Sequence, residues 1–545
     1  MLKIFFERLE GMTGLSKESI LDRLPYIGLD IEGTDGESVR IEYNPNRPDF
    51  STDYGIARAL RGLVGKEVGA KRYRASPGRV RVSADRSVAK VRPFVACAVA
   101  RGLRLDEETI RQLISMQEDL HNGIGRKRKK VAIGLHNLDV ISPPIYYAGK
   151  DAVFSFVPLG SSEEMSVKDI LEKTETGMAY GKLLAGASAY PMLYDSKGTV
   201  LSFPPIINGQ KTRVDTLTRN LFVDVTSTDA RLGNEALAIV CCALADAGAK
   251  LETVSVRRGN TRETTPMLGP SKMRFDGRLA EAVTGLALTR KEMKACLRRC
   301  RLDLDAKGWA VIPPYRVDIL HPVDLAEELA IGYGLDRMTP AYPPSSEPGR
   351  FDPAVTSLED LCVTMAEAGF NETMNYDLVD GPTLYGKFGR GAASRLEVEN
   401  PRSVEHHLLR DSLIPSLMAV LGRNTKNEYP QRVFEGGRIF SRQGEGTKET
   451  FSVAALSAHS ASSFTEAKMY LQALMKRHFD VEAETRPASH WAFAEGRSAQ
   501  AFVRTLAVGH LGEVKPSALA AFGVDVPVCG FEIHLPSRQT GRNPA

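Results

Sequence analysis

The chain has 545 residues, of which 43% are hydrophobic and 25% are charged, a composition typical of folded rather than disordered proteins. Its net charge of +4 is too small by itself to indicate a nucleic-acid-binding protein. No apolar run is long enough to cross a bilayer, and charged residues interrupt the first segment too early for a signal peptide. We therefore expect a cytoplasmic protein of several domains with no membrane partner.

The first 75 residues are predicted to form a small α+β domain, which ends before a Ser76-Pro-Gly turn. Its loop Asn44–Pro48 contains two prolines and is therefore stiff. Thr52 is a suitable N-cap for the helix that follows. We expect this loop to have a structural role.

Residues 80–260 alternate between expected strands and helices, which indicates a mixed α/β domain. Side chains of the strand around 221–226 alternate between two faces. Phe222, Asp224 and Thr226 share one face and apolar residues share the other, which by itself indicates a half-exposed strand with a polar face. The other expected elements are strands at 91–99, 131–135, 153–157 and 199–203, and helices at 110–121, from a capping box at Ser166 and from a cap at Asp229.

A third unit, over residues 268–340, ends in a segment with four carboxylates within eleven residues. Asp324, Glu327 and Glu328 stand at positions i, i+3 and i+4 of an expected helix, so they share one side. Asp318 lies before the helix, beyond a short turn, and can fold back to complete the set. Oxygen ligands of this kind suit a hard cation, so we expect Mg²⁺.

The same spacing also matches a helix capping box. Asp324 would accept hydrogen bonds from the first-turn amides, and Glu327 would reach back to the main chain. Both acids would then complement the helix dipole. Spacing alone does not choose between the cap and the metal site, and one residue can serve both.

A proline-rich stretch at 340–349 predicts a linker. Beyond it, a helix is expected to start at Asp352 or Thr356 and to end at Gly369. A strand-rich domain over 350–540 contains this helix. The order of elements therefore predicts a multidomain protein of α/β and α+β class.

The basic run at 126–130 follows the helix expected at 110–121. Such runs are usually solvated turns. The alternative is a contact with an RNA backbone, for which the candidate residues are Arg126, Arg128, Lys129 and Lys130.

The seven cysteines, an odd number without an export signal, indicate free thiols. Cys296 and Cys300 are spaced i, i+4 but have no second pair at zinc spacing, so we expect them to be structural. His406 and His407 are interpreted as part of a polar cluster at a helix start, not as catalytic groups.

Segments along almost the whole chain resemble the β subunit of phenylalanyl-tRNA synthetase, of the archaeal and eukaryotic type. The family's magnesium motif maps onto Asp318, Asp324, Glu327 and Glu328 without a gap. The matching segments are Glu42–Phe50, Gly55–Gly62, Lys130–Asn137, Phe203–Gly209, Arg219–Asp229, Pro314–Gly334, Phe434–Phe440, Glu495–Ser498 and His510–Pro516.

The resemblance implies an enzyme complex of two α and two β subunits that uses ATP and Mg²⁺ to attach phenylalanine to tRNA(Phe). It implies that the C-terminal domain is a degenerate antiparallel-sheet core of the class II synthetases. The Gly-rich motif that holds ATP with its terminal arginine is missing here, because Gly530–Pro536 offers no cradle of backbone amides. Adenylation is therefore expected on the α subunit.

The resemblance also implies that the central domain hydrolyses tRNA carrying tyrosine in error. An aromatic wall beside a carboxylate and a hydroxyl would suit a bound tyrosine, and the candidate residues are Asp224, Thr226 and, more weakly, Asn208. A different class of function stays open, a non-catalytic RNA-binding or scaffold protein derived from a synthetase subunit. A metal hydrolase is less favoured, because only His321 lies near the carboxylates as a base.

Overall fold

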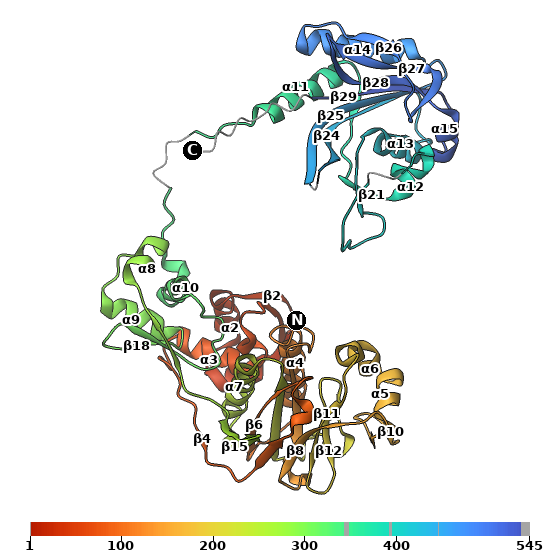
Figure 1. The fold of residues 1–545 in the computed structure, drawn as a ribbon. Helices are drawn as coiled ribbons and strands as arrows, with labels where there is room; N and C mark the ends of the chain where they lie inside the picture. The colour runs from red at the N-terminus through yellow and green to blue at the C-terminus, as the bar shows by residue number, and fades with distance from the viewer. Residues whose placement is uncertain (1, 343–347, 392–394, 445, 536–545) are drawn as a thin grey trace. The chain divides into compact units, whose positions relative to one another are not determined.

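The computed structural model describes residues 2–342, 348–391, 395–444 and 446–535, and the chain divides into two compact units (Figure 1). Unit 1 is Met1–Tyr342 and unit 2 is Pro343–Ala545. The boundary falls within the proline-rich stretch predicted as a linker, although residues 343–347 of that stretch lie outside the described ranges. No helix among the described residues has both the length and the apolar character needed to cross a membrane.

The N-terminal part of unit 1 packs helices on a three-stranded antiparallel sheet of order β1-β3-β2. Thr52 caps α3 through a hydrogen bond from Gly55 N, as predicted. Gly55 is required there, because a Cβ atom would lie 1.7 Å from the carbonyl oxygen of Asp49. The elements are β1 (Leu2–Phe5), α1 (Phe6–Thr13), α2 (Lys17–Arg23), β2 (Leu29–Thr34), β3 (Ser38–Tyr43) and α3 (Asp53–Leu63).

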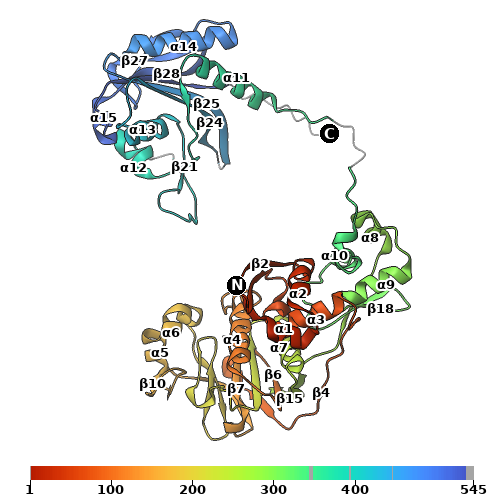
Figure 2. The same ribbon diagram turned by 180° about the vertical axis from the view of Figure 1, so that it is seen from behind.

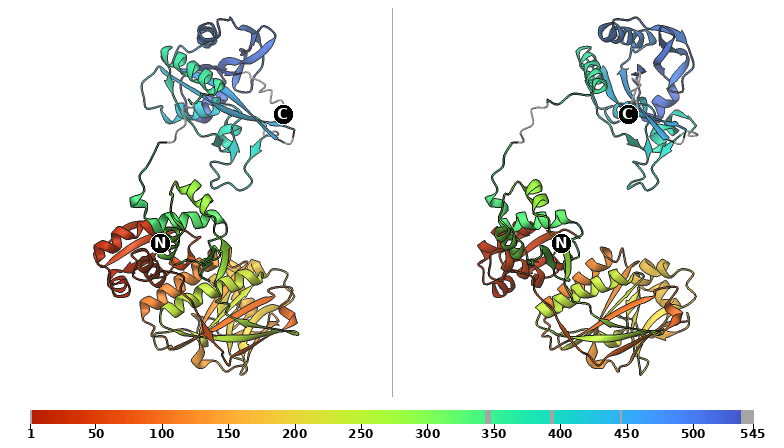
Figure 3. Two further views of the ribbon diagram at one scale, coloured as in Figure 1. Left: turned by 90° about the vertical axis from the view of Figure 1, so that its left-hand side faces the viewer. Right: turned by 60° about the vertical axis from the view of Figure 1, so that its left-hand side comes forward.

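The central part of unit 1 is built on an eleven-stranded mixed sheet, whose main path runs β13-β12-β11-β8-β5-β15-β6-β14-β7. Two long helices, α4 and α7, pack on one face (Figures 2 and 3). The strands are β4 (Ala75–Ser76), β5 (Arg81–Ala84), β6 (Phe94–Arg101), β7 (Val131–Asn137), β8 (Ile145–Lys150), β11 (Tyr190–Asp195), β12 (Val200–Phe203), β13 (Ile207–Asn208), β14 (Asn220–Ser227), β15 (Lys250–Arg258) and β16 (Thr261–Thr265), and the helices are α4 (Glu107–Asn122), α5 (Val167–Lys173), α6 (Glu175–Tyr180) and α7 (Ala230–Asp246).

Strand β14 alternates between two faces as predicted, but neither face is exposed. Val223 contributes to the core beneath α4 and α7, whereas Phe222 contributes to a second core on the opposite face of the sheet. The half-exposed strand inferred from the pattern is therefore wrong, because β6 and β7 flank β14 and both faces are covered. The strand expected at 153–157 shrinks to β9 (Ser155–Phe156), since Val153 is exposed in a turn.

The last part of unit 1 packs helices α8 (Gly277–Thr284), α9 (Arg290–Arg299) and α10 (Pro322–Tyr333) around a three-stranded sheet of order β17-β19-β18. Cys296 is buried and the thiol of Cys300 donates to the carbonyl oxygen of Glu328 at 3.1 Å, so both cysteines are structural. The strands are β17 (Ser271–Arg274), β18 (Asp303–Leu304) and β19 (Trp309–Ile312).

Unit 2 is a seven-stranded sheet of order β20-β24-β25-β29-β28-β27-β26, antiparallel except for the pairing of β20 with β24. Helices α11 and α14 cover one face, and α13 and α15 cover the other (Figure 1). Of the two starts proposed for α11 (Pro353–Glu367), the structure selects a cap by Asp352. The other elements are α13 (Ile414–Arg423), α14 (Phe464–Phe479), α15 (Pro516–Phe522), β20 (Asn371–Glu372), β24 (Gln431–Gln443), β25 (Gly446–Ala458), β26 (Glu484–Pro487), β27 (Phe493–Val503), β28 (Leu506–Val514) and β29 (Val528–His534).

Candidate functional site

Unit 1 contains a cavity of about 590 Å³ beside the open edge of β7. Helix α4 forms one wall, and the segment 202–214, which includes β13, forms another. Most of the lining is apolar, with a small number of polar side chains, which is the usual character of a small-molecule site. Two of the three residues proposed from the sequence, Asp224 and Asn208, line this cavity.

Asp224 is held in place by neighbouring polar side chains. It is 1% exposed, and its Oδ1 lies 2.7 Å from His136 Nε2 and 3.4 Å from Ser202 Oγ, which donates to it. His136 Nδ1 in turn lies 2.9 Å from Thr212 Oγ1. A buried carboxylate with its partners fixed in this way is a preorganised hydrogen-bond acceptor.

Thr226 is not brought to the cavity. Its hydroxyl accepts from Arg92 Nε at 3.0 Å, and its carbonyl accepts from Arg92 Nη2 at 2.9 Å. Phe222, expected as an aromatic wall, packs instead in the core on its own face of the sheet. The set proposed from the strand is therefore corrected to Asp224 alone, because tertiary neighbours occupy the other two side chains.

The basic turn divides into an exposed part and an anchored part. Arg126, Lys127 and Lys129 are exposed, and Arg126, Lys127 and Arg128 adopt positive φ angles of 48°, 53° and 64°, which non-glycine residues rarely adopt. Arg128 folds inward to Glu118, so its proposed role as an RNA contact is replaced by a structural one. Lys130 is half-buried, and its carbonyl oxygen accepts from Thr228 N.

Arg92 fixes this turn from below. It donates to the carbonyl oxygens of Arg128 at 3.2 Å and Lys129 at 3.4 Å. Burial lowers the pKa of Arg92 to about 10, and the guanidinium is still charged at neutral pH. One buried arginine thus connects β14 to the strained turn, which explains how the turn holds its conformation.

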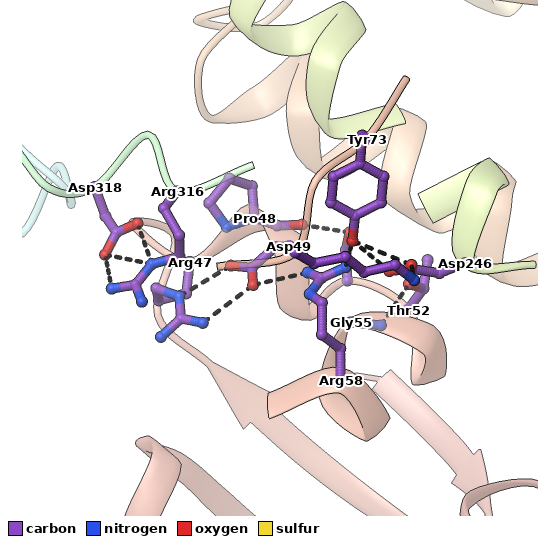
Figure 4. Close-up of polar contacts among 12 residues, drawn as sticks. Arg47, Pro48, Asp49, Thr52, Gly55, Arg58, Tyr73, Asp246, Arg316 and Asp318 are labelled. Carbon is purple, nitrogen blue, oxygen red and sulfur yellow. Dashed lines mark hydrogen bonds and ion pairs between the residues drawn. The ribbon is translucent and has the colours of Figure 1, made fainter. Parts of the chain in front are cut away.

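The four carboxylates of the predicted magnesium motif are arranged around an arginine. Arg316 is buried and binds Asp318 at 2.7 and 2.9 Å (Figure 4). It also binds Glu328 at 2.5 and 3.0 Å. Both carboxylates are thereby neutralised by a bidentate cation.

The other two carboxylates have different environments. Asp324 Oδ2 accepts from the main-chain N–H groups of Leu320 and His321, both at 2.7 Å. A capping box is present, but it starts three residues earlier than expected, and Asp324 takes the reach-back role that was expected of Glu327. His321 is the N-cap, since Pro322 occupies the favoured first helical position. Glu327 is largely exposed, and its pKa is raised by its partial burial and by the charges of Glu328 and Asp324.

These carboxylates do not fit a four-ligand magnesium site. Within the described ranges, no three or more His, Cys, Asp or Glu side chains converge to hold a metal ion. The expected site is corrected because two of its members neutralise Arg316 and a third caps α10. The sequence indicated negative charge at this place, and arginine supplies the compensating cation.

Glu328 Oε1 also lies 3.9 Å from Arg47 Nη1, which connects Arg316 to a buried ion-pair network in the N-terminal domain, part of which is drawn in Figure 4. Arg47 and Arg58 both donate to Asp49, at 2.9 to 3.1 Å. Arg58 also pairs with Asp246 at the end of α7, and its guanidinium stacks 3.6 Å above the ring of Tyr315. The loop that carries Asn44–Pro48 therefore has the structural role predicted for it, joining three parts of unit 1.

Comparisons with known proteins agree with this architecture. Residues 340–535 match the family model for the phenylalanyl tRNA synthetase beta chain CLM domain, and residues 273–335 match the tRNA synthetase B5 domain model. The phenylalanine–tRNA ligase beta subunit of Archaeoglobus fulgidus is 40% identical over 541 residues, covering 98% of each chain. The chain belongs to the phenylalanine–tRNA ligase beta subunit family.

Further beta subunits of this family support the assignment. That of Methanococcoides burtonii is 36% identical over 542 residues, covering 98% of this chain and 99% of the relative. A solved N-terminal fragment of the Pyrococcus horikoshii phenylalanyl-tRNA synthetase beta subunit has 34% identity and a TM-score of 0.59, covering 61% of this chain and 99% of the fragment. The resemblance inferred from the motifs is therefore confirmed, and these matches favour it over the RNA-binding scaffold alternative.

Several polar residues in and beside the cavity were not found from the sequence. His136, Ser202 and Thr212 hold Asp224 or its partner, and Glu118 and His121 are polar residues of the α4 wall. Their contacts connect residues far apart in the chain. One signal was present in the sequence, because His136 is a polar residue within an otherwise apolar strand. The sequence did not show that its partner is Asp224.

Proposed function

We propose that the chain is the β subunit of a cytoplasmic phenylalanine–tRNA ligase that assembles with an α subunit as an α2β2 complex. The complex uses ATP and Mg²⁺ to attach phenylalanine to tRNA(Phe). Adenylation takes place on α, since the Gly-rich ATP motif is missing from this chain and unit 2 is a degenerate class II core. The β chain scaffolds α and binds tRNA. No step is assigned to a metal at the four carboxylates, because Arg316 neutralises two of them.

The cavity beside β7 is the site at which the complex hydrolyses tyrosine attached in error to tRNA(Phe). A phenylalanine pocket rejects an added hydroxyl by only about a hundredfold, so a second site that selects tyrosine is needed. The observation that carries this proposal is the buried Asp224 carboxylate in the cavity wall. The phenol of tyrosine donates a hydrogen bond to it. Phenylalanine cannot, and a buried acceptor left without its donor costs binding energy.

The exposed part of the basic turn contacts the RNA. Arg128 of this turn lines the cavity, while Arg126, Lys127 and Lys129 face solvent. An aminoacyl group that enters the cavity brings the last phosphates of its RNA to this rim, and exposed cations attract phosphates. The turn is held rigidly by Arg92, so its charges are fixed near the rim.

The test is deacylation of preformed Tyr-tRNA(Phe) by the assembled complex. Asp224→Ala should slow hydrolysis about tenfold to a hundredfold, by loss of one hydrogen bond to a charged group. Phenylalanylation should stay near the wild-type rate. Wild-type complex that does not deacylate Tyr-tRNA(Phe) would rule out the editing role, and an unaffected Asp224→Ala variant would rule out this residue.

A further inference from the structure

The cavity has a second fixed carboxylate, on a different element from Asp224. Glu118 of α4 lines the cavity, and its side chain is 39% exposed. Its Oε1 accepts from Arg128 Nη2 at 2.7 Å and lies 3.2 Å from His121 Nδ1. In the described part of the chain, no hydrogen bond is made to Glu118 Oε2. One carboxylate oxygen is thus anchored, and the other is available to a ligand.

The surroundings keep this carboxylate ionised and oriented. Ile133 N donates to His121 Nε2 at 2.8 Å, so Nε2 is an acceptor and the proton of a neutral ring is on Nδ1, directed at Glu118. Burial also lowers the pKa of His121, which favours the neutral ring. Burial raises the pKa of Glu118, but the hydrogen bond from His121 and the charge of Arg128 outweigh it and hold the pKa below its ordinary value.

Arg128 is itself fixed by groups other than Glu118. Its Nη1 donates to the carbonyl oxygens of Ile206 at 2.9 Å and Pro205 at 3.3 Å, and its guanidinium lies 4.5 Å from the centre of the Tyr180 ring. The two carbonyl groups belong to the segment 202–214, which forms another wall of the cavity. Glu118 therefore has a set position beside the exposed basic turn and not a mobile one at the surface.

The two carboxylates suit different ends of an aminoacyl ester. Asp224 is almost completely buried, so a neutral phenol is a less costly partner for it than a charged amine, which must lose its water. Glu118 is partly exposed and adjoins the turn where the RNA leaves the cavity. The α-amino group is next to the ester and therefore lies on the RNA side of the amino acid.

We propose that Glu118 is the binding subsite for the protonated α-amino group of the aminoacyl ester, through its free Oε2. This inference rests on the proposed editing role of the cavity and adds a second point of recognition to it. Asp224 binds the side-chain hydroxyl, and Glu118 binds the free amine. Two fixed points, at the phenol and at the amine, set the position of the α-carbon and therefore of the ester attached to it.

The experiment compares Tyr-tRNA(Phe) with N-acetyl-Tyr-tRNA(Phe), whose amine carries no charge. The assembled α/β complex is used with wild-type β, with Glu118→Gln, and with Glu107→Gln as the matched control. Glu107 is an exposed residue of the same helix, away from the cavity. Thermal unfolding and phenylalanylation rates confirm that each variant is folded and assembled.

We expect wild-type and Glu107→Gln complexes to deacylate Tyr-tRNA(Phe) about 30-fold more efficiently, in kcat/KM, than the N-acetylated substrate, from the loss of one charge-assisted hydrogen bond. Glu118→Gln should lose this preference by slowing only the free-amine substrate. Equal rates for Glu118→Gln and wild type, or an equal loss on both substrates, would overturn the subsite. Wild-type complex with no deacylation at all would instead overturn the editing role of the cavity.

Discussion

Gly134 lies directly opposite Asp224 in the pairing of β7 with β14. A Cβ atom on Gly134 would stand 2.4 Å from Asp224 Oδ1 and 2.5 Å from His136 Nε2. The absence of a side chain at Gly134 is therefore what allows the His136–Asp224 hydrogen bond to form beside the cavity. The site depends on a residue that has no functional group of its own.

Gly134→Ala should disturb this site without unfolding the domain. The new methyl group must displace Asp224 or His136, at a cost of about 1–3 kcal/mol in the free energy of unfolding, as for other overpacked cores. Hydrolysis of Tyr-tRNA(Phe) should fall at least as far as in Asp224→Ala. Gly269→Ala is the control, because a Cβ atom there meets nothing within 4 Å. Wild-type deacylation by Gly134→Ala would contradict the described geometry.

Glu328 and Glu327 should respond oppositely to neutralisation. Glu328→Gln leaves buried Arg316 with one carboxylate fewer, and breaking such a pair costs about 3 kcal/mol of stability. The raised pKa of Glu327 means that its folded form prefers the proton. The protonated side chain therefore favours the folded state, and this stabilisation is lost as the pH rises through that pKa. At neutral pH Glu327 is charged, so Glu327→Gln should be neutral or slightly stabilising.

The measurement is chemical denaturation of both variants, with and without added magnesium. If all four carboxylates instead held a magnesium ion, Glu327→Gln would be destabilising. It would also abolish any stabilisation by the metal. That result would restore the magnesium site and overturn the arrangement around Arg316.

Arg58→Met should destabilise unit 1 by about 3–5 kcal/mol, because it leaves two buried carboxylates, Asp49 and Asp246, without this cation. Burial raises the pKa of Asp49, but Arg47 and Arg58 outweigh it and hold the pKa at about 2. Stability from Asp49 is thus present above its unfolded pKa and is lost as the pH falls toward about 2.

Urea unfolding of the Arg58→Met chain at several pH values tests this network. Arg104→Met is the control, as Arg104 is exposed. If the free energy of unfolding changed by less than about 1 kcal/mol in Arg58→Met, this arginine would contribute no more than a surface ion pair, and the network would not stabilise unit 1 as described.

The exposed part of the basic turn should contribute to binding and not to the chemical step. Alanine at Arg126 or Lys129 should raise the KM for Tyr-tRNA(Phe) deacylation and leave kcat unchanged. Each substitution should also make the affinity for the substrate less dependent on salt. The slope of log affinity against log salt concentration should fall by about one for each phosphate that the turn no longer binds. The measurement is KM as a function of salt concentration. Lys250→Ala, at another exposed position, is the control. An unchanged salt slope in both turn variants would show that the turn is merely solvated.

Local signals in the sequence predicted much of the fold. Thr52, Ser166 and Asp229 cap helices as expected, because capping depends on neighbours within the same turn. The alternation of β14 was predicted for the same reason, since it follows from the pleat. The burial of its two faces depends on α4 and α7 on one side and on the second core on the other, which no local pattern in the strand identifies.

The site was predicted less completely. Asp224 was proposed from the polar face of its strand together with the family resemblance, whereas the partner of Thr226, Arg92, is distant in sequence and was not foreseen. The four carboxylates were interpreted as metal ligands because like charges require a nearby cation. That cation was Arg316, two residues before Asp318, and sequence alone does not show which side chain folds into a cluster.

The central claim is that the cavity selects tyrosine through Asp224, and the most direct measurement is the ratio of kcat/KM for deacylation of Tyr-tRNA(Phe) to that of Phe-tRNA(Phe). The wild-type complex should favour the tyrosyl substrate by about a hundredfold or more, as expected when a site hydrogen-bonds the distinguishing hydroxyl. Asp224→Asn, which keeps the size of the side chain, should reduce this ratio about tenfold or more while phenylalanylation continues. An unchanged ratio in Asp224→Asn would contradict the claim.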